Sequence, residues 1–488
     1  MSTGAQSITL PARNAERDCI LAARLFDADF YADAYREMLQ PGEDALSHYL
    51  RAGDGLGLLP APWFDPIRYR LERPGAVHGN AFAHALGSGS GRVRTVAQRL
   101  RAWGAALLWR CQRLRGRLFA RKGMPQTGPL LRMFPRIRIR QPEIELLRYP
   151  ELVEGNRRQA QNYAAPNQTQ FTVDGRQYRI ASPAPAFFLD RIRENRPFAF
   201  PRLPQGFWDS LAFINDVQGD MLKAMPSLPC TDAERRRLAF RLCKELQPWN
   251  GAFEENVTDE VVACIAWHKD RPDYFRAASF KGFPTFDERP FYYANQGTVH
   301  QERMQLLAQN FTADELLLDA TLWKRWLISG ALRELPALCR PHPVVMLGPQ
   351  AVRAVPAAWE LHSCNFLEIA PENTQRHRHV VLQRLQTALA GARRAAQNDA
   401  RGLHPIVLMQ CGGSLAYWLI ARLYRDYPEA FYLDLGQVFN AWCYHVPENT
   451  ERAWNYLYLR RVIDNMGLAD YYRGLMGADF EQLLRRFA

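Results

Sequence analysis

Residues 404–442, HPIVLMQCGGSLAYWLIARLYRDYPEAFYLDLGQVFNAW, constrain the fold of this chain more than any other stretch. Residues 406–409 are apolar and rich in branched side chains, a pattern typical of a strand buried on both faces. After the glycine turn that follows, residues 415–426 carry apolar side chains at helical spacing. Residues 431–435 are predicted to form a second buried strand, which ends in Asp434-Leu435-Gly436. The stretch therefore predicts a strand, glycine turn, helix and strand joined by a right-handed parallel crossover.

The glycine turn of this unit is a candidate phosphate site. Gly412 and Gly413 let the backbone bend sharply between Cys411 and Ser414, and Ser414 is placed to cap the helix. Free backbone N–H groups at a helix N-terminus bind phosphate readily. A turn that only lets the helix pack against the strand accounts for the same glycines, so both interpretations stay open.

The composition indicates a large globular protein with anionic partners. The chain has 488 residues, 47% of them hydrophobic and 23% charged, which suits two or three domains. The net charge of +12 favours a nucleotide, a nucleic acid or a lipid surface as partner, although a general arginine bias explains it equally well. The nine cysteines include no CxxC pair, and the chain shows neither a signal peptide nor a spanning apolar run. We expect a cytoplasmic protein, free or on the inner face of the cell membrane.

Residues 24–91 contain an internal repeat. The period is roughly forty residues, the length of one helix–turn–helix unit. The corresponding pairs are Phe26 and Phe64, Asp27 and Asp65, Tyr31 and Tyr69, and His48 and His84. Asp44 and Asn80 are predicted to cap the second helix of each copy, and both histidines are expected to pack against the facing helix rather than bind metal.

Residues 92–141 follow as a basic helix and a linker. No acidic residue occurs between Glu72 and Glu143, and residues 92–122 carry an apolar stripe flanked by arginines. Such a helix can lie on an anionic membrane surface, or its stripe can pack on the protein. Nucleic acid is disfavoured, because aromatic and basic residues do not alternate as they do in a stacking groove. The proline-rich remainder predicts a linker, and residues 1–23 a flexible N-terminus.

Strands and helices alternate through residues 142–442, which predicts an α/β domain with a mainly parallel sheet. A hairpin is expected to turn at Asp174–Gly175. Further strands are predicted at residues 198–200, 343–348 and 366–369. Helices are predicted at residues 186–195, 208–225, 232–246, 259–268, 314–332 and 373–398, with a helical tail over residues 443–488.

Three segments resemble the GT-D glycosyltransferases, over roughly residues 185–442. FLDRIRENRPFAFPRLPQGFWDSL, from Phe188, is similar to the opening of that family: a helix, a strand and then R-f-G-D-G-E. HPVVMLGPQA resembles its middle strand, and residues 405–442 resemble its ending, a strand, glycine, helix, strand and D-x-G. The repeat resembles the short helical repeats found beside bacterial polysaccharide glycosyltransferases. The resemblance implies a Rossmann-like fold.

The chain departs from the family at its two acids. Arg202 and Gly206 match the opening motif, but Gln205 and Phe207 stand where the family has carboxylates at the nucleotide-sugar diphosphate and its metal. Neither side chain supplies a charged oxygen ligand to a hard cation. Either Arg202 neutralises the diphosphate without metal, as a bidentate arginine can, or the chain has lost activity. Both alternatives stay open.

The resemblance implies a hexosyltransferase-type enzyme that transfers a sugar from a nucleotide-sugar, most often a UDP-sugar, to a cell-surface glycan or lipid-linked acceptor. Asp434, after a buried strand, is a candidate ribose or base contact, or only a cap of the next turn. Asp209 and Asp216 are the candidate bases. The expected substrate-binding residues are Arg202, Gln205, Gly206, Cys411, Gly412, Gly413, Ser414, Asp434 and Gly436.

Two alternatives stand beside this hypothesis. The missing acids also fit a non-catalytic protein that binds a nucleotide-sugar or serves as a scaffold in a glycan-assembly complex. A methyltransferase-like nucleotide domain is disfavoured, because its glycine turn would follow the first strand of the domain rather than a late one.

Overall fold

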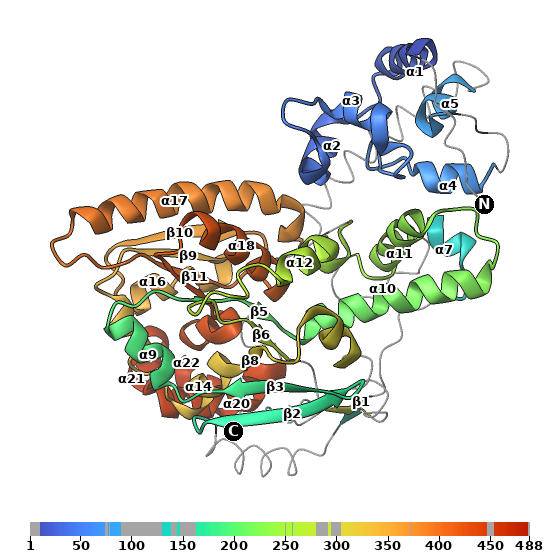
Figure 1. Ribbon diagram of the computed structural model, residues 1–488. Helices are drawn as coiled ribbons and strands as arrows, with labels where there is room; N and C mark the ends of the chain where they lie inside the picture. The colour runs from blue at the N-terminus through green and yellow to red at the C-terminus, as the bar shows by residue number, and fades with distance from the viewer. Residues whose placement is uncertain are drawn as a thin grey trace. The chain divides into compact units, whose positions relative to one another are not determined.

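Figure 1 shows the structure, a computed structural model. It describes residues 10–73, 77, 79–88, 129–137, 144–146, 163–248, 250–255, 257–279, 291–293, 304–371, 373–446 and 453–486. The predicted basic helix at residues 92–122 lies outside these ranges, as does most of the predicted linker. The chain forms two compact units. We name them the repeat unit (residues 1–139 and 214–248) and the sheet unit (residues 140–213 and 249–488), and describe each by itself.

The sheet unit contains a five-stranded sheet in which every pair is parallel. In spatial order its strands are β10 (Cys364–Ile369), β9 (Val344–Pro349), β11 (Ile406–Met409), β12 (Phe431–Asp434) and β4 (Ala199–Phe200). The chain leaves β9 toward β10 but leaves β11 in the opposite direction, toward β12. The carboxyl ends of β9 and β11 therefore form a topological switch point, where open parallel sheets bind ligands.

A second five-stranded sheet adjoins the first through one shared segment. Its order is β2 (Asn167–Val173), β3 (Arg176–Ser182), β8 (Leu316–Asp319), β6 (Ala277–Ala278) and β5 (Arg202–Leu203). Only the β2–β3 hairpin is antiparallel. Pro201 alone separates β4 from β5, and its carbonyl accepts from the Ala277 N–H at 3.0 Å. The carboxyl ends of β5, β6, β8 and β12 consequently lie along one edge.

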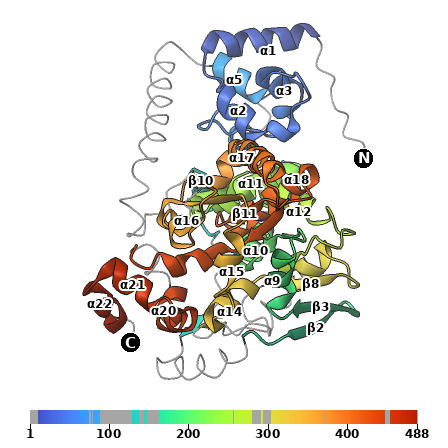
Figure 2. The same cartoon turned by 90° about the vertical axis from the view of Figure 1, so that its left-hand side faces the viewer.

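Helices cover both faces of the parallel sheet (Figures 1 and 2). Alternate side chains of each strand enter two different cores, because successive residues of a strand point to opposite faces. Val407 and Met409 pack with α17 (Arg378–Asn398) and α18 (Gly413–Asp426), whereas Ile406 and Leu408 pack in the opposite core. That second core also takes side chains from α9 (Ala186–Arg193), α14 (Leu322–Ser329), α16 (Val355–Ala358), η6 (Gly436–Trp442) and α20 (Ala453–Met466).

Most predicted elements of the sheet unit are confirmed. The strand at 406–409 and the Asp174–Gly175 turn occur as predicted, and the predicted helix at 373–398 appears as a short 3-10 turn followed by α17. The tail is helical through α20, α21 (Ala469–Met476) and α22 (Asp479–Arg486).

Three predictions about local structure were wrong. Residues 1–23 were expected to be a flexible N-terminus, but α1 (Leu10–Ala23) is a helix, and its Ile20 is fully buried in the core of the repeat unit. The expected helix at 314–332 is split into β8 and α14, because pairing with β3 and β6 overrides the helix propensity of its leucines. Ser414 does not cap α18: Gly412 holds the cap position, and no side chain bonds there.

The repeat unit confirms the internal repeat in detail. Its first copy holds α2 (Ala28–Ala34) and α3 (Ala45–His48), and its second copy holds α4 (Pro66–Leu71) and α5 (Ala81–Gly87). As predicted, α3 and α5 are capped by Asp44 and Asn80. In both copies the tyrosine of the first helix bonds the histidine of the second: Tyr31 to His48 at 2.8 Å and Tyr69 to His84 at 3.1 Å. The histidines therefore pack as expected.

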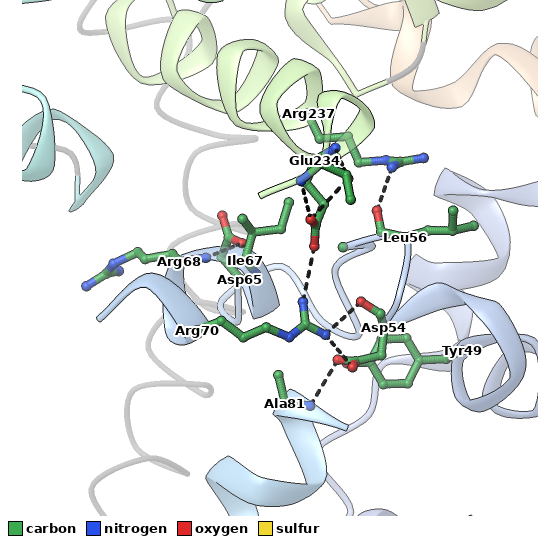
Figure 3. A network of polar contacts seen from close by, with 12 residues as sticks. Tyr49, Asp54, Leu56, Asp65, Ile67, Arg68, Arg70, Ala81, Glu234 and Arg237 are labelled. Carbon is green, nitrogen blue, oxygen red and sulfur yellow. Dashed lines mark hydrogen bonds and ion pairs between the residues drawn. The ribbon is translucent and has the colours of Figure 1, made fainter. Parts of the chain in front are cut away.

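The repeat unit also includes α11 (Asp232–Leu246), which is distant in sequence (Figure 3). Arg70 pairs with Asp54 of the first copy and with Glu234 of α11, the latter at 3.4 Å. Arg237 donates to the carbonyl of Leu56 at 2.5 Å, and Arg241 pairs with Asp65 at 2.6 Å. Because Arg241 and Asp65 are mostly buried, at 10% and 15% exposed, these contacts make α11 part of the repeat unit.

This arrangement predicts what removal of residues 1–141 will do. The fragment 142–488 keeps α11 but loses Leu56, Asp65 and Arg70. The contacts that these residues make with Arg237, Arg241 and Glu234 are therefore lost. We expect α11 to open locally, since helices without tertiary packing are marginal. Limited trypsin digestion followed by mass spectrometry should show rapid cleavage after Arg235–Arg241 in the fragment but not in the full chain. Equal protection in both would contradict this.

Candidate functional site

The carboxyl edge of the sheet unit brings together four polar side chains, which we call the polar cluster. Arg202 lies on β5, Asp434 ends β12, Gln410 follows β11, and Asn440 lies on η6. Because β11 and β12 are parallel neighbours, their carboxyl ends meet at one edge. Residues that lie up to 232 positions apart in the sequence therefore meet at this edge.

Arg202 and Asp434 form a buried ion pair. Nη2 of Arg202 lies 2.7 Å from Oδ1 of Asp434, and the side chains are 11% and 1% exposed. Nη1 of Arg202 donates to the carbonyl of Ala320 at 3.0 Å, at the end of β8. Burial raises the pKa of Asp434 above its usual value, and the Arg202 guanidinium partly offsets this. Arg202 therefore serves first as the counter-charge of Asp434.

Gln410 and Asn440 join the ends of β11 and η6 through one amide–amide hydrogen bond. Nε2 of Gln410 donates to Oδ1 of Asn440 at 3.0 Å. Asn440 is fully buried, and Gln410 is half-buried. A buried primary amide costs free energy wherever one of its donor or acceptor positions is left unsatisfied.

Each member of the polar cluster leaves one buried atom without a hydrogen-bond partner among the described residues. These atoms are Arg202 Nε, Asp434 Oδ2, Gln410 Oε1 and Asn440 Nδ2. An unsatisfied buried donor or acceptor costs about 1–3 kcal/mol. Four such atoms occur on residues at the carboxyl edge of the parallel strands, where open α/β sheets bind ligands, so this edge is the candidate functional site.

Glycines are required where the backbone closes on this cluster. Gly412 has φ +86°, and a Cβ at Gly413 would overlap the ring of Pro204. A Cβ at Gly436, whose φ is +55°, would overlap the Arg202 guanidinium. Close packing against Pro204 accounts for Gly413, so the packing interpretation of the glycine turn holds there. Binding of phosphate by the same turn stays a proposal.

Cys411 and Ser414, on either side of the two glycines, are both buried. Burial raises the pKa of the Cys411 thiol well above its usual value, and the Asp434 carboxylate adds to this, so Cys411 is a poor nucleophile.

The start of α10 (Gln205–Ala224) carries Gln205 and Phe207, the two positions at which the GT-D pattern has acids. Gln205 donates to Asp209 one turn further along, from Nε2 to Oδ2 at 2.9 Å. Gly206 is exposed and Phe207 is buried. The chain thus has a carboxylate on the same face as Gln205, displaced by one helical turn from the expected position.

The second candidate base lies elsewhere. Asp216 belongs to the part of α10 in the repeat unit, where its charge adds to the effect of burial in raising the pKa of Cys243 on α11 to about 12. Of the two candidates, only Asp209 shares a unit with Arg202.

Sequence reasoning missed three residues at this edge. Gln410 and Asn440 lie within the motif, but nothing in their spacing shows that their amides meet. Asp319 falls in a predicted helix, yet it is fully buried at the end of β8, next to the Ala320 carbonyl that Arg202 contacts. Its Oδ1 accepts from the backbone and hydroxyl of Thr321, and Oδ2 lies 3.3 Å from Arg325. The signal for Asp319 was an apolar run ended by an acid.

Within the part of the chain that the structure describes, no three His, Cys, Asp or Glu side chains gather as metal ligands. Among the same residues, no helix is both long and apolar enough to cross a membrane.

No protein-family model matches the chain, and neither curated proteins nor solved structures gave a match.

Proposed function

We propose that the polar cluster binds a nucleotide-sugar, and that the protein is a glycosyltransferase acting on a cell-surface glycan or lipid-linked acceptor. The observation that carries this proposal is the set of four unpartnered buried atoms at the carboxyl edge of the parallel strands. A ligand rich in donors and acceptors would satisfy them, and dinucleotides and nucleotides bind at this edge in open α/β sheets.

The position of the motif segments supports a GT-D-type arrangement. Arg202, from the segment that resembles the family's opening, bonds Asp434 of the D-x-G segment that resembles its ending. Gly436 completes the contact, because only a residue without Cβ leaves room for the Arg202 guanidinium. Two segments matched independently in sequence thus form one local structure.

The chemistry of transfer would be divided among these residues. Arg202 is already neutralised by Asp434, so its contribution to a diphosphate is its Nε donor rather than a free positive charge. Backbone N–H groups of the Gly412–Gly413 turn are the additional donors in this proposal. Asp209, half-buried and bonded by Gln205, is the candidate base. Gln205 and Phe207 replace the family's acids, so we expect a reaction independent of divalent metal.

A non-catalytic protein that binds a nucleotide-sugar is the second candidate. It is favoured by the same ion pair, because a neutralised Arg202 stabilises a departing diphosphate less than a free arginine would. Binding without turnover is its distinguishing outcome.

A thermal-shift screen tests the proposal. UDP-, GDP-, CMP- and dTDP-sugars are compared with S-adenosylmethionine as control, followed by an assay of donor hydrolysis. A bound nucleotide-sugar at a hundred times its Kd should add about 2.7 kcal/mol to the free energy of unfolding. A shift with S-adenosylmethionine alone, or with none of these compounds, would reject the proposal.

A lipid-linked acceptor would place the protein at a membrane surface, and we propose residues 92–122 as the contact. We expect the full chain to float with anionic vesicles at low salt and to be released as salt rises, because salt screens surface charge. A variant lacking residues 92–122 should not float. Equal flotation of both proteins would show that this segment makes no membrane contact.

A further inference from the structure

The amide pair of the polar cluster, Gln410 and Asn440, has two atoms without a hydrogen-bond partner among the described residues. Each primary amide carries one acceptor oxygen and one donor nitrogen. The bond from Gln410 Nε2 to Asn440 Oδ1 uses one of each and leaves Gln410 Oε1 and Asn440 Nδ2 unpartnered and buried. Each open atom belongs to an amide already fixed by this bond. The protein therefore holds one unpartnered acceptor and one unpartnered donor on two amides that a hydrogen bond joins.

From this pair we infer that Gln410 and Asn440 recognise the imide edge of a uracil base in a uridine diphosphate donor. The inference rests on the proposed function and names the base that this site accepts. Uracil N3–H would donate to Gln410 Oε1, and a neighbouring uracil carbonyl would accept from Asn440 Nδ2. Both open atoms would then be satisfied by adjacent atoms of one planar ring.

The hydrogen-bonding edge of uracil suits this pair. It has a donor between two acceptors, so N3–H can bond Gln410 Oε1 while either neighbouring carbonyl accepts from Asn440 Nδ2. Recognition of a base also explains why amides are kept at a position where apolar side chains would cost less.

The test compares UDP with its N3-methylated analogue on the full chain by calorimetric titration. Methylation at N3 removes the donor but leaves ribose and diphosphate unchanged. We expect the analogue to bind at least a hundredfold more weakly, because sites built to hydrogen-bond a group strongly reject ligands that lack it. Equal affinity for the two, or tighter binding of CDP, GDP or ADP than of UDP, would overturn the inference and leave the proposed function standing. Binding of no nucleotide and no nucleotide-sugar would reject both.

A variant gives an independent readout. Gln410→Met keeps the length of the side chain but removes both polar atoms. It should weaken UDP binding at least tenfold and abolish the discrimination against the N3-methylated analogue. Gln383→Met, at an exposed position of α17, is the matched control and should behave as the wild type. A Gln410→Met protein that still discriminates between the two ligands would overturn the assignment of Gln410.

Discussion

Arg202→Ala is expected to lower the free energy of unfolding by about 3–5 kcal/mol. The substitution leaves the Asp434 carboxylate, 1% exposed, without its counter-charge and removes the bond to the Ala320 carbonyl. Removing one partner of a buried pair costs more than the pair contributes, because the remaining charge stays desolvated. Urea denaturation at neutral pH measures the loss.

The pH dependence of this loss is set by Asp434. Burial raises its pKa in the native state, and loss of Arg202 raises that pKa further. Just above the usual pKa of aspartate, the native state then holds a proton that the unfolded chain has released, so stability falls as pH rises through that interval. The destabilisation of Arg202→Ala should consequently be smaller at mildly acidic pH than at neutral pH.

Two further variants test whether the loss of stability comes from the buried ion pair rather than from the loss of any arginine. Arg196 pairs with Glu194 at the surface, where both side chains are more than half exposed, so Arg196→Ala should change stability little. Arg202→Met combined with Asp434→Leu removes both charges and should recover most of the loss. If Arg202→Ala were no more destabilising than Arg196→Ala, the ion pair would not hold this edge together.

Gly436→Ala should disrupt the polar cluster without removing any of its four side chains. Gly436 and Gly402 have nearly the same backbone angle, with φ of +55° and +59°. An alanine at either position costs about 1–2 kcal/mol for the left-handed conformation. Only at Gly436 does the added Cβ overlap Arg202, while at Gly402 it meets open space. Besides the cost of the left-handed backbone, Gly436→Ala must therefore displace the Arg202 guanidinium from Asp434.

The difference in stability between Gly436→Ala and Gly402→Ala measures the effect of displacing the Arg202 guanidinium. We expect Gly436→Ala to be at least twice as destabilising as Gly402→Ala in thermal and urea denaturation, and to lose nucleotide-sugar binding that Gly402→Ala keeps. Equal effects on stability and binding would show that the position of Arg202 matters to neither.

The sequence predicted those elements whose boundaries are marked by local chemistry. The strand at 406–409 is bounded by a proline before it and by the glycine turn after it, and it occurs at those residues. The capping residues of the repeat were equally clear, because a cap and its helix lie within a few residues of each other.

Elements whose structure depends on residues far away in the sequence could not be predicted from local patterns. Leu316–Asp319 has leucines that favour a helix, and only pairing with β3 and β6 makes it a strand. Nothing local assigns α11 to the repeats, because Arg70 and Glu234 lie 164 residues apart.

In the candidate site, the sequence predicted individual residues but not the contacts between them. Arg202, Asp434 and Gly436 were predicted from motifs, and the structure brings them into contact. That Arg202 is neutralised by Asp434 was not foreseen, because an arginine matched to a phosphate-binding motif gives no indication of a buried carboxylate 232 residues away. The meeting of Gln410 with Asn440 likewise depends on the register of β11 against β12.

The most direct test of the account is a calorimetric titration of the full chain with UDP-sugars in the presence of EDTA, repeated with Gly436→Ala and Gly402→Ala. The account predicts binding of one nucleotide-sugar per chain that persists in the chelator, survives in Gly402→Ala and is lost in Gly436→Ala. Absence of binding by the wild type to any nucleotide-sugar, or binding by Gly436→Ala with undiminished affinity, would contradict it.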